Sequence, residues 1–245
     1  MPPIPAALAT GYELFRRERF PGEVRRYQAL AEGQKPETMV IACADSRVDP
    51  ATIFQASPGE LFVVRNVAAL VPPCEQNGHY HGTSAAIEFA VTVLGVKSIV
   101  VLGHGQCGGV AASLQAAGAG PLPGVFIGPW VALLSDVRDQ LLDHRPRLSG
   151  DERQQALEHL AIKQSLINLT TFPFVAAAIE RDTLRLHGAW FSIGKGELRW
   201  LDDERGTFEI VNPTPSQARG GRARHAAAPG SSTGAAAEQS VGWNA

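Results

Sequence analysis

Three short runs of apolar residues constrain the fold of this chain more than any other feature of its sequence. They are residues 38–42 (TMVIA), 60–64 (ELFVV) and 98–102 (SIVVL). A strand with one face in water alternates polar and apolar residues, whereas a strand covered on both faces is apolar throughout. The three runs therefore predict buried strands of a mostly parallel sheet.

Helical patterns separate and follow these runs. Thr83 or Ser84 can cap a helix that continues to Leu94 and is ended by Gly95. Apolar residues at three- and four-residue intervals predict further helices over residues 131–142, 151–169 and 171–180, the last beginning near Pro173. Residues 6–20 and 23–32 predict two N-terminal helices, separated by Pro21-Gly22. This order of strands and helices is typical of an α/β fold.

The end of the folded part is expected to be a hairpin. Residues 184–193 and 197–201 flank a short glycine turn at residues 194–196, which predicts an antiparallel hairpin extending one edge of the sheet. From Pro213 onward the composition shifts to Gly, Ala, Ser and Arg without apolar periodicity. We therefore expect one folded domain over residues 1–212 and a disordered, low-complexity tail over residues 213–245.

Charge and cysteine content narrow the possible functions. The formal net charge of the 245 residues is -2, with acids and bases mixed along the chain, so we expect no nucleic-acid and no membrane partner. The N-terminus lacks the pattern of a signal peptide, which favours a cytoplasmic protein. Three cysteines are an odd number, which argues against a disulfide framework and for metal or catalytic use.

Two of these cysteines and one histidine stand at the ends of predicted strands. Cys43 ends the first apolar run, and His104 and Cys107 follow the third. Ligands at the carboxyl ends of parallel strands lie where α/β sheets place their binding sites. Each residue alone is more typical of an ordinary core or loop position, but two thiolates and one imidazole together predict a zinc site with an open fourth position.

The sequence around these three residues resembles the β-class carbonic anhydrases. Residues 43–47 (CADSR) and 104–107 (HGQC) look like the family's C-x-D-x-R and H-x-x-C signatures, and residues 58–60, 62–68, 86–91 and 188–191 are also similar, in the expected order. The resemblance covers about residues 6–211. It implies one Zn²⁺ per chain, held by Cys43, His104 and Cys107, and a carbonate dehydratase that reversibly hydrates CO₂ to bicarbonate and a proton.

The resemblance also assigns further residues. It implies that Asp45 and Arg47 form a catalytic dyad beside the zinc, in which Asp45 accepts a hydrogen bond from the metal-bound hydroxide. Arg47 can hold that carboxylate through two hydrogen bonds and keep it off the metal. The implied substrate pocket comes partly from a second subunit, so a homodimer or higher homo-oligomer is expected. Its residues are Gln34, Phe62, Val67, Phe89 and the backbone amide of Gly108.

Some positions depart from the family's patterns. Phe89 stands where the plant-like branch commonly has a tyrosine. Val40 and Phe191 occupy the places of a tryptophan and a tyrosine that form a non-catalytic bicarbonate site in the regulated branch. The chain is thus expected to resemble the plant-like branch more and to lack that bicarbonate inhibition.

Cys74, His79 and His81 lie outside the two motifs and are expected to be ordinary loop residues. Cys74 is interpreted as a free loop thiol. His79 and His81 are interpreted as solvated loop histidines, with a proton shuttle as the alternative.

Other classes of protein remain open at this stage. A related zinc hydrolase acting on a CO₂ analogue such as carbonyl sulfide would use the same ligands. Residues 103–108 also fit the G-x-G-x-x-G pattern of dinucleotide-binding proteins, but residues 127–130 supply no acid for the ribose. A non-enzymatic protein with structural zinc would need a fourth ligand, which Cys74 is not spaced to provide.

Overall fold

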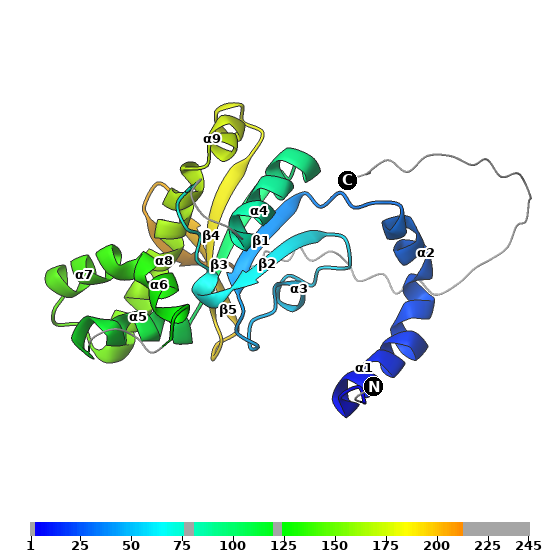
Figure 1. Ribbon diagram of the computed structural model, residues 1–245, viewed down its shortest axis with the longest axis horizontal. Helices are drawn as coiled ribbons and strands as arrows, with labels where there is room; N and C mark the ends of the chain where they lie inside the picture. The colour runs from blue at the N-terminus through cyan, green and yellow to red at the C-terminus, as the bar shows by residue number, and fades with distance from the viewer. Residues whose placement is uncertain (1–2, 76–80, 120–123, 213–245) are drawn as a thin grey trace, which may run out of the picture.

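A computed structural model describes residues 3–75, 81–119 and 124–212. Its centre is a six-stranded sheet of order β2-β1-β3-β4-β5-β6 (Figure 1). Strands β1 to β4 run parallel, and β5 and β6 are added antiparallel at one edge. The expected fold class is therefore confirmed. The strands are β1 Thr38–Cys43, β2 Leu61–Asn66, β3 Ser98–His104, β4 Arg185–Ser192, β5 Glu197–Asp202 and β6 Thr207–Ile210.

The helices begin and end close to the positions expected from the sequence, with local differences. Gly95 ends the second helical region in the left-handed conformation, as predicted, but that helix begins at Gly82 rather than after Thr83 or Ser84. The helix expected over residues 131–142 is divided into three segments. The helices after β1 are α3 Pro50–Ile53, η2 Val67–Ala69, α4 Gly82–Glu88, η3 Phe89–Leu94, α5 Gly108–Ala119, α6 Ile127–Val131, η4 Ala132–Leu134, α7 Ser135–His144, α8 Gly150–Thr170 and α9 Pro173–Glu180.

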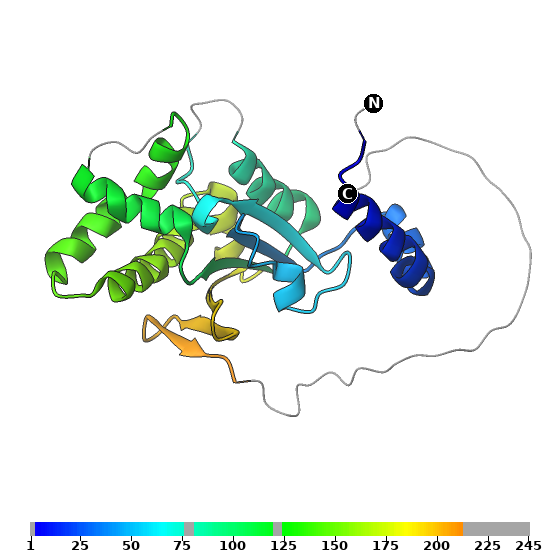
Figure 2. The ribbon, with the colours of Figure 1, turned by 90° about the horizontal axis from the view of Figure 1, so that it is seen from below.

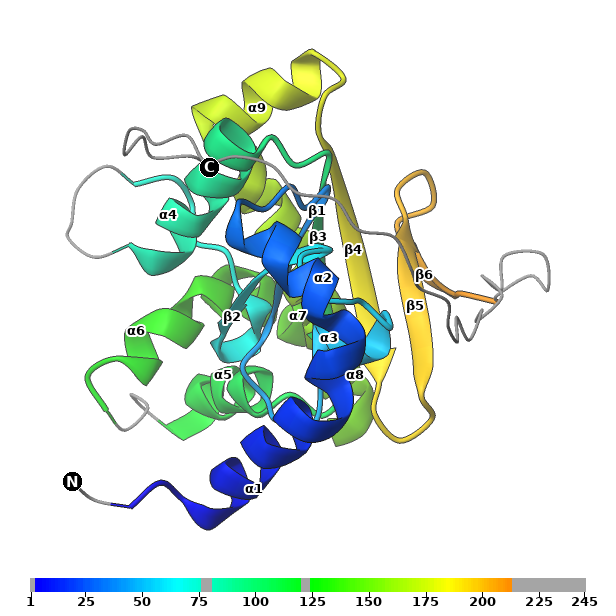
Figure 3. The same ribbon diagram turned by 90° about the vertical axis from the view of Figure 1, so that its right-hand side faces the viewer.

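Both faces of β1 are buried, which explains its continuous apolar run. Met39 and Ile41 pack in a cluster with residues of α4, α8 and α9. Val40 and Ala42 point to the opposite face, where α3 and the β5 residues Leu198 and Trp200 cover them. The hairpin of β4 and β5 is confirmed, and it continues into β6, which the sequence pattern did not reveal (Figure 3).

The N-terminal helices form an arm, residues 6–31, that projects away from the sheet (Figures 1 and 2). It consists of α1 Ala6–Leu14, a π-helical turn η1 Phe15–Arg19 and α2 Phe20–Ala31. The predicted break at Pro21-Gly22 is wrong, because these segments follow one another directly. Pro21 directly follows the π-helical turn, in which the Phe20 N–H bonds to the carbonyl oxygen of Phe15, and this wider turn accommodates the proline. All residues of the arm are described, and none is buried.

The predicted disordered tail, residues 213–245, and His79 lie outside the described residues. In the described part of the chain, no single helix is long and apolar enough to cross a membrane. The pair α8 and α9, bent by 88°, meets that test only when its two helices are taken together.

Candidate metal centre

The order of the strands brings the three predicted zinc ligands together. Cys43 is the last residue of β1 and His104 the last residue of β3, and these strands are parallel neighbours. The chain passes from β1 to β2 on one side and then returns to β3 on the other side. Such a switch point opens a crevice at the carboxyl ends of the strands. Cys107 reaches the same crevice from the loop before α5.

The donor atoms of these residues have the spacing of a metal site. The two Sγ atoms of Cys43 and Cys107 are 4.0 Å apart. Together with a ring nitrogen of His104, they lie within 4.8 Å of one another, and all three residues are buried. Two thiolates around a tetrahedral zinc ion stand about 3.8 Å apart. The observed separation therefore fits zinc closely.

The orientation of His104 supports the same conclusion. Its Nδ1 donates a hydrogen bond to the carbonyl oxygen of Gly105 at 2.9 Å, which leaves the lone pair on Nε2. Within the described ranges, this buried Nε2 has no hydrogen-bond partner. A histidine that ligates a metal typically donates its other N–H in this way. The three residues therefore fit one zinc ion.

The two sulfurs do not ionise independently. The hydrogen bond between the two thiols lowers the pKa of Cys43 below its ordinary value. The same contact, together with burial, raises the pKa of Cys107 above its ordinary value. One sulfur thus ionises readily, and a cation between the pair is needed for both to become thiolates.

Asp45 and Arg47 form the predicted pair. The Arg47 guanidinium donates from Nε to Asp45 Oδ1 at 2.9 Å and from Nη2 to Oδ2 at 2.7 Å. It also donates to the carbonyl oxygen of Gln106 at 3.1 Å, which ties the two signature motifs together. These hydrogen bonds hold the pKa of Asp45 well below its usual range. Asp45 Oδ2 stands 3.9 Å from His104 Nε2, next to the ligand atoms.

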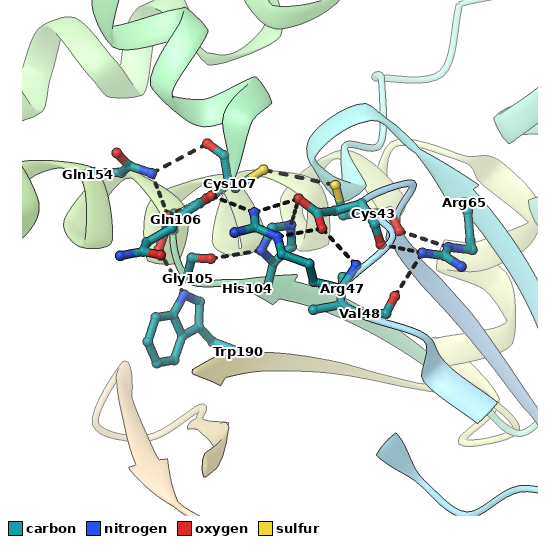
Figure 4. A network of polar contacts seen from close by, with 12 residues as sticks. Cys43, Arg47, Val48, Arg65, His104, Gly105, Gln106, Cys107, Gln154 and Trp190 are labelled. Carbon is teal, nitrogen blue, oxygen red and sulfur yellow. Dashed lines mark hydrogen bonds and ion pairs between the residues drawn. The ribbon is translucent and has the colours of Figure 1, made fainter. Parts of the chain in front are cut away.

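Arg65 supports the Cys43 loop, a role that the sequence did not reveal. It donates hydrogen bonds to the carbonyl oxygens of Cys43, Asp45 and Val48 at 2.9, 2.6 and 2.8 Å (Figure 4). Arg65 lies in residues 62–68, which are similar to a segment of the family. The sequence of this segment does not indicate which atoms the Arg65 side chain contacts.

Glu158 of α8 supports the second motif and was also missed. It is 3% exposed, and its Oε1 accepts a hydrogen bond from the backbone N–H of Cys107 at 3.0 Å. Burial raises the pKa of this carboxyl group, and the surrounding donors partly offset that effect. The sequence did contain a signal for this role. Glu158 is a charged residue four positions before Ile162, on the face of α8 that carries the buried residues.

The predicted substrate residues lie on several elements. Phe62 and Phe89 stack with ring centroids 5.9 Å apart, and Phe89 is 39% exposed. Val67 is 42% exposed and lines an apolar cleft of about 500 Å³ together with Trp130 and His81. Gly108 begins α5, next to Cys107, whereas Gln34 is exposed between the arm and β1.

An α/β sheet with two thiols and one imidazole at its switch point defines a class of protein, the mononuclear zinc enzymes with an open coordination position. The carbonic anhydrase family model matches residues 38–198. The chain belongs to this family, and its relatives place it in the β class.

Two curated relatives are similar over most of the chain. The β carbonic anhydrase 6, mitochondrial, of Arabidopsis thaliana is 38% identical over 76% of this chain and 64% of its own length. A carbonic anhydrase of Pseudomonas aeruginosa is 37% identical over 84% of this chain and 91% of its own. The chain thus spans less than two thirds of the Arabidopsis protein and nearly all of the Pseudomonas one.

Solved structures agree with these relatives. The β-carbonic anhydrase CcaA matches with a TM-score of 0.76 and 30% identity, over 84% of this chain and 98% of that one. A structure of tetrameric β-carbonic anhydrases from Sordaria macrospora matches with a TM-score of 0.65 and 33% identity, over 80% and 92% of the chains. Family and donor set together support zinc binding and carbonate dehydratase activity, which interconverts CO₂ and bicarbonate.

Proposed function

We propose that the site formed by Cys43, His104 and Cys107 hydrates CO₂ itself, with Asp45 and Arg47 as its catalytic dyad. A zinc ion bound there supplies an activated water as the nucleophile. Asp45 accepts a hydrogen bond from the reacting water and so orients it toward the carbon of CO₂. Arg47 keeps the carboxylate ionised and holds it beside the ligands, so that it would not itself bind the metal.

The geometry of the dyad is the observation that carries this proposal. A two-point pair between a guanidinium and a carboxylate is more rigid than a single contact, and the third bond, to Gln106, fixes the guanidinium itself. Asp45 is therefore held 3.9 Å from His104 Nε2 and outside the donor group of Cys43, His104 and Cys107 that would hold the metal. A carboxylate with so low a pKa accepts hydrogen bonds throughout the neutral and alkaline range.

The proposal includes a homodimer or a larger homo-oligomer. The arm exposes Leu8 and Tyr12, which are 66% and 63% exposed, and the β2 edge and η3 expose further apolar residues, among them Val63 and Val93. Apolar patches of this kind mark interfaces between proteins. A second copy would cover them, and Gln34 would reach the partner's pocket. The tetrameric relatives from Sordaria macrospora agree with such an assembly.

Stopped-flow measurement of CO₂ hydration tests the dyad, with Asp45→Asn as the variant. We expect its kcat/KM to fall about 100-fold, because the amide is uncharged and its NH₂ group cannot accept one of the two hydrogen bonds from Arg47. Asp182→Asn is the matched control, because this exposed aspartate has a left-handed backbone that asparagine tolerates. An Asp45→Asn enzyme as fast as wild type would contradict the proposal.

The same protein preparations also test whether CO₂ or carbonyl sulfide is the preferred substrate. Carbonyl sulfide hydrolysis is measured in parallel, and we expect kcat/KM for CO₂ to be the larger by orders of magnitude. The reverse order would identify a carbonyl sulfide hydrolase that uses the same ligands.

We also propose a cytoplasmic location and insensitivity to bicarbonate. A reducing compartment would keep both ligand thiols available for zinc, and fractionation of the source cells with an antibody tests this. Val40 is buried in β1, and the partly buried Phe191 packs against the same apolar cluster, an environment poorly suited to an anion. Rates at pH 6.5 should therefore show no cooperative loss as bicarbonate is added.

A further inference from the structure

We propose that Glu158 is a positioning residue of the metal centre, whose carboxylate fixes the backbone of Cys107 and thereby the direction of the Sγ ligand. It does not contact substrate. The inference rests on the ligand assignment but not on the proposed substrate, so its test measures metal binding directly.

The Glu158 carboxylate of α8 joins its own helix to the ligand loop and to β4. Oε1 accepts the N–H of Cys107 at 3.0 Å and the side-chain amide of Gln154 at 3.1 Å. Oε2 accepts the indole N–H of Trp190 at 3.1 Å. Gln154 also donates to the carbonyl oxygen of Cys107, at 3.4 Å. Both backbone polar groups of the ligand residue are therefore held by this network, from α8 and β4.

Trp190 is a rigid anchor for the carboxylate. A Cβ atom on Gly105 would come within 3.0 Å of the indole ring, so the ring lies directly against the ligand loop. His159 contacts the same ring edge-on at 5.2 Å between centroids, and the Arg199 guanidinium lies over it at 5.3 Å. An indole held on several sides gives Glu158 a fixed partner rather than a mobile one.

The ligand loop needs such a support. Gln106, between the two ligands, has a φ of 56°, a left-handed conformation that is uncommon outside glycine and asparagine. Strained backbone of this kind persists only where surrounding contacts determine it. The hydrogen bond from Cys107 to Glu158 holds the residue that directly follows the strained one.

Only a carboxylate satisfies all three donors. Its two oxygens accept from Cys107, Gln154 and Trp190, and it has no hydrogen of its own when ionised. A glutamine in the same place could offer its oxygen to Cys107, but its NH₂ group would then face the indole N–H. Two donors would meet, and one would be left buried without an acceptor. This explains why a nearly fully buried charge is present beside a metal ligand.

Glu158→Gln tests the proposal, with Glu158→Gln/Trp190→Phe as the rescue variant. Mutation of a residue that hydrogen-bonds to a metal ligand typically lowers the metal affinity by about 10- to 100-fold. We expect Glu158→Gln to weaken zinc by at least about tenfold, measured by competition with a chromophoric chelator. In the cobalt(II)-substituted protein, the thiolate-to-cobalt absorption bands should shift. Trp190→Phe removes the opposing donor, so the double variant should recover part of the affinity and the wild-type bands.

Controls separate positioning from general stability. Glu180→Gln, an exposed substitution at the end of α9, should leave affinity and spectrum unchanged. Thermal unfolding of the metal-free proteins reports stability independently. Wild-type zinc affinity and cobalt spectrum in Glu158→Gln would overturn the proposal. So would a loss of fold in both the single and the double variant, because that would assign Glu158 a purely structural role.

Discussion

The metal centre and the N-terminal arm of this chain differ in burial and in the contacts that support them. At the metal centre, Arg65 holds the backbone of one thiol ligand and Glu158 holds the other, and all three ligands are buried. The arm consists of regular helices. All of its residues are described, and none of them is buried. One chain therefore suffices to assemble the ligand set, whereas within the described residues the arm leaves its apolar side chains exposed, as at interaction surfaces.

The first prediction, with the largest effect, tests whether zinc binding at the metal centre is independent of assembly through the arm. Cys107→Ser removes one of three ligands, so zinc should be lost and CO₂ hydration should fall by at least about 1000-fold. If the chain assembles as proposed, the size of the assembly should stay unchanged, because Cys107 is buried and is not part of the arm. Zinc analysis, stopped-flow rates and light scattering measure the three quantities.

Cys74→Ser is the control for this experiment, because Cys74 is a half-buried free cysteine outside the ligand set. Loss of zinc in that variant as well would show that the ligand assignment is incomplete. Dissociation of Cys107→Ser into monomers would show that the centre and the arm are coupled.

The second prediction changes the arm and leaves the metal centre intact. Leu8→Asp together with Tyr12→Asp places two charges on its exposed apolar surface. If a second copy covers that surface, the dissociation constant of the oligomer should rise by about 100-fold or more. Zinc content should remain at one ion per chain. Sedimentation at several protein concentrations measures the dissociation constant.

A charge change at Glu13, also exposed on α1, serves as the control for the arm variant. Glu13→Lys should leave the dissociation constant within a few-fold of wild type. Equal weakening by both changes would indicate a general charge effect on the arm rather than an apolar contact.

The smallest effect concerns the response of the sheet and its helices to acid. Burial, with Arg199 and Lys163 nearby, lowers the pKa of His159 to about 4. The folded state therefore favours neutral His159. This contribution to stability is complete above the unfolded pKa of about 6.5 and is lost as the pH falls toward 4. Allowing for partial solvent exposure, the free energy of unfolding should drop by roughly 1–2 kcal/mol between pH 7 and pH 5.

His159→Gln removes this titration and should flatten that part of the pH dependence, as measured by urea unfolding. His144→Gln, at an exposed histidine of α7, should keep the wild-type dependence. An unchanged slope in His159→Gln would mean that other groups account for the acid sensitivity.

Much of the fold and the ligand set could be predicted because the signals are local. Continuous apolar runs identified β1, β2 and β3, and a left-handed glycine ended η3 where expected. The predicted break at Pro21 failed because a π-helical turn before it accommodates the proline. The strand β6 was missed because its four residues are too few for a pattern.

The sequence by itself determined which atoms can bind the metal, because Cys43, His104 and Cys107 follow buried strands at a recognisable spacing. Its resemblance to the family also predicted the pair of Asp45 and Arg47, which stand two residues apart. Only the tertiary structure decided what holds these ligands in place. Glu158 is 51 residues from Cys107 and Arg65 is 22 residues from Cys43. Contacts over such distances arise from packing, and no local pattern specifies them.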